Sequence, residues 1–142
     1  MNNFLLPIRF EAILYVKKGD DYKFLLIKRI PEDGDFWQPV TGTQESKESL
    51  IDCLYRELEE EINIRKTEVR HLTDMFYSFT WEKGPVVITE YVFGVELTEE
   101  RPIVLSKEHN DQRWCSFEEA VGLLGKDNNI KALKEFNSRF IV

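Results

Sequence analysis

One segment constrains the fold of this 142-residue chain more than any other, and it runs from Gly42 to Ile64. Apolar residues recur in it at intervals of three and four, which is typical of an amphipathic helix packed on a core. They are Ile51, Leu54, Leu58 and Ile62. Ser46 precedes this run and is the expected N-cap. The flank of this helix is therefore held at a fixed position relative to the core.

Three carboxylates fall together on that flank. Glu57, Glu60 and Glu61 occupy positions i, i+3 and i+4, which are neighbours on a helix surface. Like charges so placed repel each other by a few tenths of a kcal/mol per pair. A solvated acidic face is the ordinary explanation of such a run. The spacing instead favours a divalent cation bound among the three side chains.

The same segment resembles the Nudix box, the signature G-x5-E-x7-R-E-U-x-E-E-x-G-U in which U is aliphatic. The matching residues are Gly42, Glu48, Arg56, Glu57, Leu58, Glu60, Glu61 and Ile64. Only Asn63 departs, where the family has glycine, and asparagine is the next-best residue for a left-handed conformation after a helix. The resemblance covers the whole chain and implies a single Nudix domain over residues 1–142.

The implied architecture is α+β, an α/β/α sandwich with a mixed β-sheet between helices. The order of expected elements agrees with it. Strands are expected over residues 8–16, 22–29, 68–81, 86–97 and 112–114. Capped helices are expected to begin after Ser116 and after Asp127 or Asn128. The 68–81 and 86–97 strands are expected to form an antiparallel pair.

The metal implied by the resemblance is Mg²⁺, or Mn²⁺ in its place. Mg²⁺ prefers oxygen ligands and is commonly held by a few carboxylates together with substrate phosphates. Glu57, Glu60 and Glu61 would supply the carboxylates. Gly42 could add its backbone carbonyl, because a residue without a side chain lets the loop approach the ion.

Arg56 also has a role implied by the box. It is expected to orient Glu57 from the neighbouring position or to form an ion pair with Glu48. The alternative is an ordinary arginine on the helix surface.

A general base must come from outside the metal-binding carboxylates. The segment Ile103–His109, followed by a tryptophan, is similar to the part of the dihydroneopterin triphosphate and dATP pyrophosphohydrolase subfamily where a glutamate beside a histidine lies over the metal. Glu108 is therefore the candidate base or further ligand. Glu90 is an alternative, and Glu57 is another if it does not bind the metal directly. His109 is expected to be a surface histidine or one with its hydrogen bonds satisfied.

Substrate contacts are expected between the second strand and the box. Lys28 and Arg29 end that strand and are candidates for the phosphates, although a solvated strand end explains them equally well. Phe36 and Trp37 either pack under the box helix or line a pocket for a flat base. Together with Gln38 they belong to the segment Phe-Trp-Gln-Pro-Val-Thr-Gly, which is similar to the same subfamily.

The composition limits the partners. A net charge of −7 without any basic block argues against nucleic acid and anionic membranes. No apolar stretch approaches the ~20 residues of a membrane span. The N-terminus lacks the features of a signal peptide, and Cys53 and Cys115 are expected to be buried thiols. We therefore expect a cytoplasmic monomer or homodimer that binds a small molecule.

The expected reaction is hydrolysis of a phosphoanhydride. The resemblance points to a nucleoside or pterin triphosphate, of the dATP or dihydroneopterin triphosphate type, cleaved to a monophosphate and pyrophosphate. Diadenosine polyphosphates and other nucleoside diphosphates linked to a group X are the alternative substrates. A non-catalytic nucleotide-binding module is the alternative function.

Overall fold

The computed structural model describes residues 4–107 and 109–141. Its sheet contains β1 (Leu5–Lys18), β2 (Asp21–Arg29), β3 (Trp37–Gln38), β4 (Val40–Glu45), β5 (Val69–Leu72), β6 (Tyr77–Lys83), β7 (Val86–Leu97) and β8 (His109–Cys115). The helices are α1 (Leu50–Ile62), α2 (Phe117–Leu123) and α3 (Asp127–Phe140), with short 3₁₀ turns at Pro31–Asp33 and Lys66–Glu68.

The sheet is mixed, because β1 pairs with β7 in parallel and the other pairs are antiparallel. Its main order is β3-β2-β1-β7-β5, and β4, β6 and β8 pair with β1, β7 and β2 respectively. The expected strand over 68–81 is in fact two strands. Both β5 and β6 pair with β7, at its two ends, so the single antiparallel pair expected from the sequence was an oversimplification.

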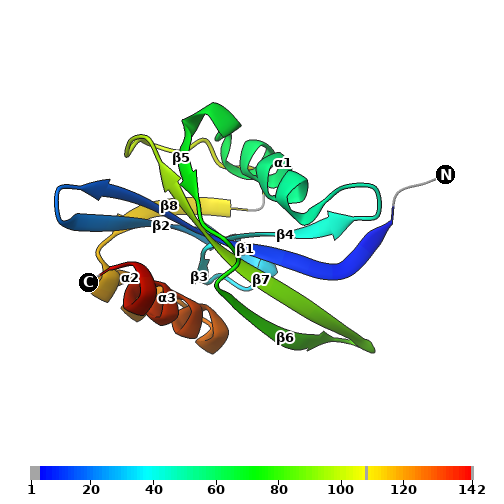
Figure 1. The fold of residues 1–142 in the computed structure, drawn as a ribbon. Coiled ribbons are helices and arrows are strands. Elements are labelled where there is room, and N and C mark those ends of the chain that lie inside the picture. Colours follow the sequence, from blue (N-terminus) through cyan, green and yellow to red (C-terminus); the bar gives the residue numbers. More distant parts are fainter. Residues whose placement is uncertain (1–3, 108, 142) are drawn as a thin grey trace.

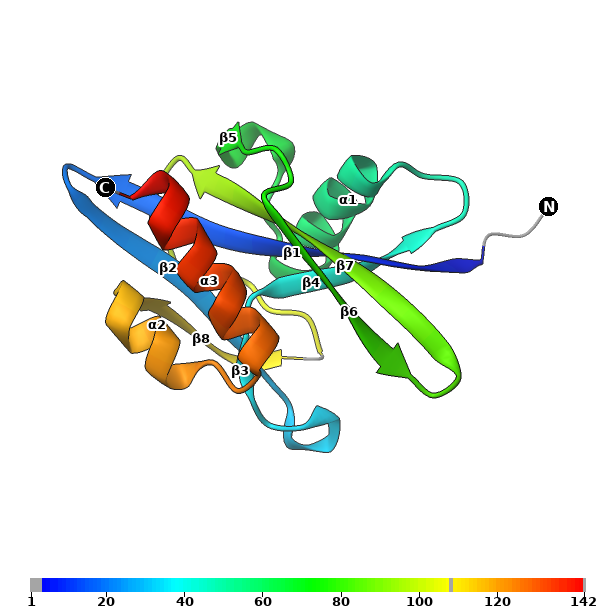
Figure 2. The same cartoon turned by 60° about the horizontal axis from the view of Figure 1, so that its bottom comes forward.

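Helices cover both faces of the sheet (Figure 1). The box helix α1 lies on one face, while α2 and α3 lie on the other, as the turned view also shows (Figure 2). Strand β1 alternates accordingly: Phe10, Ala12 and Leu14 pack in the core under α1, and Ile13 and Tyr15 pack in the core under α3. The expected α/β/α sandwich with a mixed sheet is confirmed.

The two ends of α1 differ in how well the sequence predicted them. Ser49 is the N-cap, and its side chain accepts a hydrogen bond from the Asp52 amide. The prediction of Ser46 was wrong, because the Ser46 hydroxyl accepts the Phe4 amide 42 residues away instead. Asn63 ends the helix in the left-handed conformation with φ 54°, as expected for a residue that replaces glycine.

The later helices follow the same pattern of partial success. Ser116 and Glu119 form the expected capping box at the start of α2. At α3 the cap is Lys126, which makes no capping side-chain bond, so the prediction of Asp127 or Asn128 was wrong. Over residues 4–107 and 109–141, each helix is too short or too polar to cross a membrane.

Candidate active site

Arg56 connects three carboxylates of the box. Its Nη2 and Nε donate to the two oxygens of Glu48 at 2.6 and 2.9 Å, and its Nη1 donates to Glu57 Oε1 at 3.0 Å and to Glu60 Oε2 at 3.1 Å. The hydrogen bonds from Arg56 lower the pKa of Glu48 to about 2. Both contacts expected of Arg56 are therefore present at once, and the bidentate pair with Glu48 fixes the guanidinium plane.

Glu57 is held against β4. Its side chain is 15% exposed, and a Cβ placed on Gly42 would lie 2.5 Å from Glu57 Cγ and 2.6 Å from a ring carbon of Phe10. Glycine is thus required at position 42 for this close approach. The pKa of Glu57 is raised to about 7, mainly by burial and also by the charges of Glu61 and Glu60, against the opposing effect of Arg56.

Glu61 is fixed by residues that follow it in the chain by more than 40 positions. Its Oε2 accepts from Ser106 Oγ at 2.7 Å and lies 3.4 Å from His109 Nδ1. Gln38 Nε2 lies 3.3 Å from His109 Nε2, and an amide nitrogen can only donate. His109 therefore accepts at Nε2 and presents its Nδ1 proton to Glu61. The hydrogen bond from His109 is the main reason that the pKa of Glu61 is lowered.

Of the two alternatives expected for His109, the structure supports the histidine with satisfied hydrogen bonds. It is buried and lies at the site, not at the surface. No second histidine near it in the sequence signals this role. It depends on the pairing of β8 with β2, which places His109 opposite Arg29.

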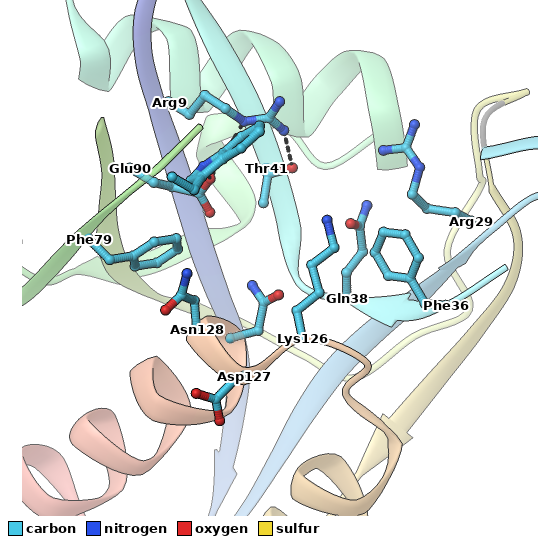
Figure 3. A pocket seen from close by; sticks show the side chains of 12 residues that line it. Arg9, Arg29, Phe36, Gln38, Thr41, Phe79, Glu90, Lys126, Asp127 and Asn128 are labelled. Atoms are coloured by element: carbon cyan, nitrogen blue, oxygen red, sulfur yellow. Dashed lines mark hydrogen bonds and ion pairs between the residues drawn. The ribbon is translucent and has the colours of Figure 1, made fainter. Parts of the chain in front are cut away.

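Two adjoining cavities lie beside these residues. The carboxylate cavity has a volume of about 310 Å³ and is lined among others by Gly42, Arg56, Glu57, Glu61 and His109. The aromatic cavity has a volume of about 540 Å³ and is lined among others by Phe36, Phe79, Trp81, Glu90, Lys126 and Asn128 (Figure 3). Both cavities are lined by Arg9, Arg29, Gln38 and Thr41. A single elongated ligand could therefore occupy both.

The predicted substrate contacts divide between these cavities and other places. Phe36, Gln38 and Arg29 line the aromatic cavity. Lys28 and Trp37 line neither of the two cavities: Lys28 Nζ pairs with Asp35 at 3.4 Å and lies 5.9 Å from the Trp37 ring. Tryptophan 37 instead packs on the core under α2 and α3.

Other lining residues were not predicted. Arg9 and Lys126 bring cations to the aromatic cavity from β1 and from the loop before α3. Periodicity shows only that Arg9 lies in a strand, and the pairing of β1 with β4 then brings its Nη2 within 2.6 Å of Thr41 Oγ1. Glu108, predicted as base or ligand, lies outside the described residues.

Comparison with known proteins identifies the family of the chain. A model of the NUDIX domain matches residues 7–137. The chain belongs to the Nudix hydrolase family. It is 33% identical over 136 residues to a dihydroneopterin triphosphate diphosphatase of Haemophilus influenzae, with 88% of this chain and 84% of that protein covered.

Two further similarities set limits on what the family membership implies. The chain is 33% identical over 120 residues to an octanoyltransferase of Myxococcus xanthus, where 81% of this chain matches only 32% of that protein. The crystal structure of an Ap4A hydrolase binary complex from C. elegans superposes with a TM-score of 0.81 at 22% identity, covering 92% of this chain and 95% of that one. At this identity the superposition shows only that the two proteins share a fold.

The residues of the box fit a hard divalent cation in their chemistry. Glu57, Glu61 and the backbone of Gly42 line one cavity, and all three offer oxygen ligands. Glu60 does not line this cavity; its side chain is 56% exposed and is bonded to Arg56 Nη1, which also donates to Glu57. In the described part of the chain no three histidine, cysteine, aspartate or glutamate side chains converge on one point. The structure thus gathers two of the three expected carboxylates.

Proposed function

We propose that this Nudix protein is a Mg²⁺-dependent pyrophosphohydrolase, with Mn²⁺ as a substitute metal, acting on a nucleoside or pterin triphosphate. The products would be a monophosphate and pyrophosphate. The observation that carries the proposal is the joining of two cavities, one lined by Glu57 and Glu61 and the other by aromatic rings, through the shared Arg9 and Arg29. A charged chain of phosphates attached to a flat ring matches this arrangement of groups.

The metal would be held by Glu57, Glu61 and the carbonyl of Gly42, with Glu60 joining them on leaving Arg56. When bound, a divalent ion neutralises charge on phosphate oxygens and lowers the pKa of a coordinated water. Arg56 makes four hydrogen bonds to these side chains: two to Glu48, one to Glu57 and one to Glu60. They fix the orientations of Glu48 and Glu57. Ser106 and His109 hold Glu61 in the same way.

The cations of β1 and β2 would bind the phosphates. Arg9 and Arg29 lie where the two cavities meet, so their guanidinium groups can donate to phosphate oxygens in the bidentate geometry that arginine favours. Two carboxylates are candidates for the general base. Glu108 is the candidate from the sequence. Glu57 is the alternative if it does not bind the metal directly, because its raised pKa suits proton transfer near neutral pH.

The similarity to the Haemophilus diphosphatase supports a triphosphate substrate of the pterin or dATP type. Diadenosine polyphosphates are the second candidate, because they contain the same kind of phosphoanhydride bond. A non-catalytic nucleotide-binding role is the third. Such a module has no need for the two partly buried carboxylates, Glu57 and Glu61, and their supporting hydrogen bonds.

The test compares Glu61→Gln and Glu57→Gln with Glu59→Gln, a change of the same kind on an exposed position of α1. Turnover of dihydroneopterin triphosphate, dATP and diadenosine tetraphosphate is measured with Mg²⁺, and the phosphate products are identified. We expect a loss of at least about a hundredfold in kcat for the first two variants, because removing one charged transition-state contact costs about that much. Glu59→Gln should keep full activity.

Three outcomes would contradict the proposal. Wild-type turnover in Glu61→Gln would place the metal elsewhere. Release of orthophosphate instead of pyrophosphate from a triphosphate would identify a different scissile bond. Tight nucleotide binding without any hydrolysis over hours would favour the non-catalytic module.

A further inference from the structure

A pair of buried carboxyl groups lies at the aromatic cavity, and the proposed chemistry does not use it. Glu90 on β7 lines the cavity and is 4% exposed, while Glu11 on β1 is 0% exposed and lies behind it. Arg9, Glu11 and Glu90 share one face of the sheet, because Arg9 and Glu90 are partners in the parallel pairing of β1 with β7 and Glu11 follows two residues after Arg9. Glu11 is paired with Val92, two residues from Glu90, so the two carboxyl groups are diagonal neighbours on that face.

The surroundings of the two groups decide which one carries the charge. Glu90 Oε1 accepts from Trp81 Nε1 at 3.1 Å and lies 3.6 Å from Arg9 Nε, so a donor and a cation compensate its charge. Glu11 Oε1 accepts from the Asn129 amide at 2.7 Å, and among the described residues its Oε2 has no hydrogen-bond partner. Burial raises the pKa of Glu11 well above its usual range, and the neighbouring charge of Glu90 raises it further. Burial raises the pKa of Glu90 as well, but Arg9 and Trp81 oppose that effect. The proton of the pair therefore resides on Glu11, and Glu90 is the anion.

A buried anion at the wall of a cavity selects its ligand. A carboxylate can only accept hydrogen bonds, and a ligand acceptor placed against it would be repelled. Its two oxygens can accept from two adjacent N–H groups in the bidentate manner known from guanidinium pairs. Glu90 and Phe79 point toward the same space (Figure 3). A flat ring that stacks on the aromatic side chains would thus present its edge to Glu90.

We propose that Glu90, oriented by Glu11, is the residue that selects the heterocycle, and that it binds a ring N–H with its adjacent exocyclic amino group. Guanine and pterin rings carry such an edge. Adenine does not, because the ring nitrogen beside its amino group is an acceptor. This inference rests on the proposed function for the placement of the triphosphate, and it makes Glu11 a positioning residue.

The experiment measures equilibrium binding of monophosphates by calorimetry without added metal, so that it does not depend on turnover. Three ligands are compared: dGMP, dIMP, which lacks the amino group, and N1-methyl-dGMP, which lacks the ring N–H. Wild-type protein should bind dGMP at least tenfold more tightly than either analogue, since each analogue removes a hydrogen bond to a charged acceptor. Equal affinities for the three ligands would overturn the inference.

Matched variants separate the two carboxyl groups. Glu90→Gln should reduce the preference to within about twofold, because an amide presents a donor where the ring N–H must bind. Glu11→Gln should keep it, because glutamine Nε2 can donate to Glu90 and its Oε1 can still accept from Asn129. If Glu11→Gln loses the preference and Glu90→Gln retains it, Glu11 is the anion that selects the ligand, and the proposal is rejected.

The outcomes are distinguishable from failure of the proposed function. A protein that binds dGMP selectively but hydrolyses no triphosphate supports the inference and contradicts the pyrophosphohydrolase. A protein that hydrolyses triphosphates but binds the three monophosphates equally well supports the pyrophosphohydrolase and contradicts the inference about Glu90. Should Glu90→Gln not fold, as judged by circular dichroism, the wild-type comparison of the three ligands still decides the question.

Discussion

Among single residues, Gly42 sets how near β4 and α1 can approach each other. It pairs with Phe10 in the sheet, and Glu57 packs directly over it. The absence of a side chain brings the Glu57 carboxylate and the Gly42 backbone into one cavity. A small change here therefore acts on the position of a carboxylate proposed to hold the metal and not only on packing.

We predict that Gly42→Ala lowers kcat by about 10- to 100-fold, the effect of a catalytic group displaced by about 1 Å. The added methyl group must displace Glu57 or Phe10, which also costs about 1–3 kcal/mol of stability by overpacking. Steady-state kinetics and urea unfolding measure the two effects.

Gly122→Ala is the matched control for this change. Gly122 is exposed on α2, and a Cβ there meets nothing within 4 Å. The Gly122→Ala variant should have unchanged activity and an equal or slightly higher free energy of unfolding, because alanine is the better helix former. A Gly42→Ala protein with wild-type kcat would show that the close approach has no part in the reaction.

Among the elements, α1 joins the core to the site. Its buried face consists of Cys53, Leu54, Leu58 and Ile62, and its flank carries the box carboxylates. Ser49 is the N-cap, so it fixes the residue at which the helix begins. The stability of this first turn also supports Arg56, which lies one further turn along and holds Glu48 in the preceding loop.

We predict that Ser49→Ala lowers the free energy of unfolding by about 1 kcal/mol, because the Asp52 amide loses its side-chain acceptor. Ser46→Ala is the control, since Ser46 accepts only an exposed hydrogen bond from the Phe4 amide. It should cost less. Chemical denaturation of both variants measures the difference, and an equal or larger loss in Ser46→Ala would return the N-cap to the position favoured by the sequence.

For the molecule as a whole, the buried proton on Glu11 links stability to pH. The pKa of Glu11 is raised well above its usual range in the folded protein by burial, whereas the unfolded chain restores the ordinary value. Between these two values the folded state binds more protons than the unfolded state. Stability from this group is therefore full below the ordinary pKa of a glutamate and is lost as the pH rises toward the folded value.

We predict that the free energy of unfolding falls more steeply between pH 5 and pH 8 in the wild-type protein than in Glu11→Gln. One linked proton contributes up to about 1.4 kcal/mol per pH unit. Glutamine keeps the hydrogen bond from Asn129 but does not titrate. Urea unfolding at four pH values measures both slopes, and parallel slopes would mean that Glu11 is ionised in the folded protein.

The sequence determined much of the box helix by itself. The recurrence of Leu54, Leu58 and Ile62 reflects the 3.6-residue period of a helix, and the same period places Glu57 and Glu61 on one flank. The left-handed conformation of Asn63 also follows from local chemistry, because few side chains tolerate it. These features were predictable since they depend on residues within a few positions of one another.

Only the tertiary structure decided which groups complete the site. Ser106 and Glu61 are 45 positions apart, and Asn129 and Glu11 are 118 apart. Spacing along the chain says nothing of such pairs, because they are created by the order and register of strands in the sheet. The same register gives His109 its role at the site. Glu60 shows the converse, since its place in the pattern was clear but its side chain is bonded to Arg56 and does not line the carboxylate cavity.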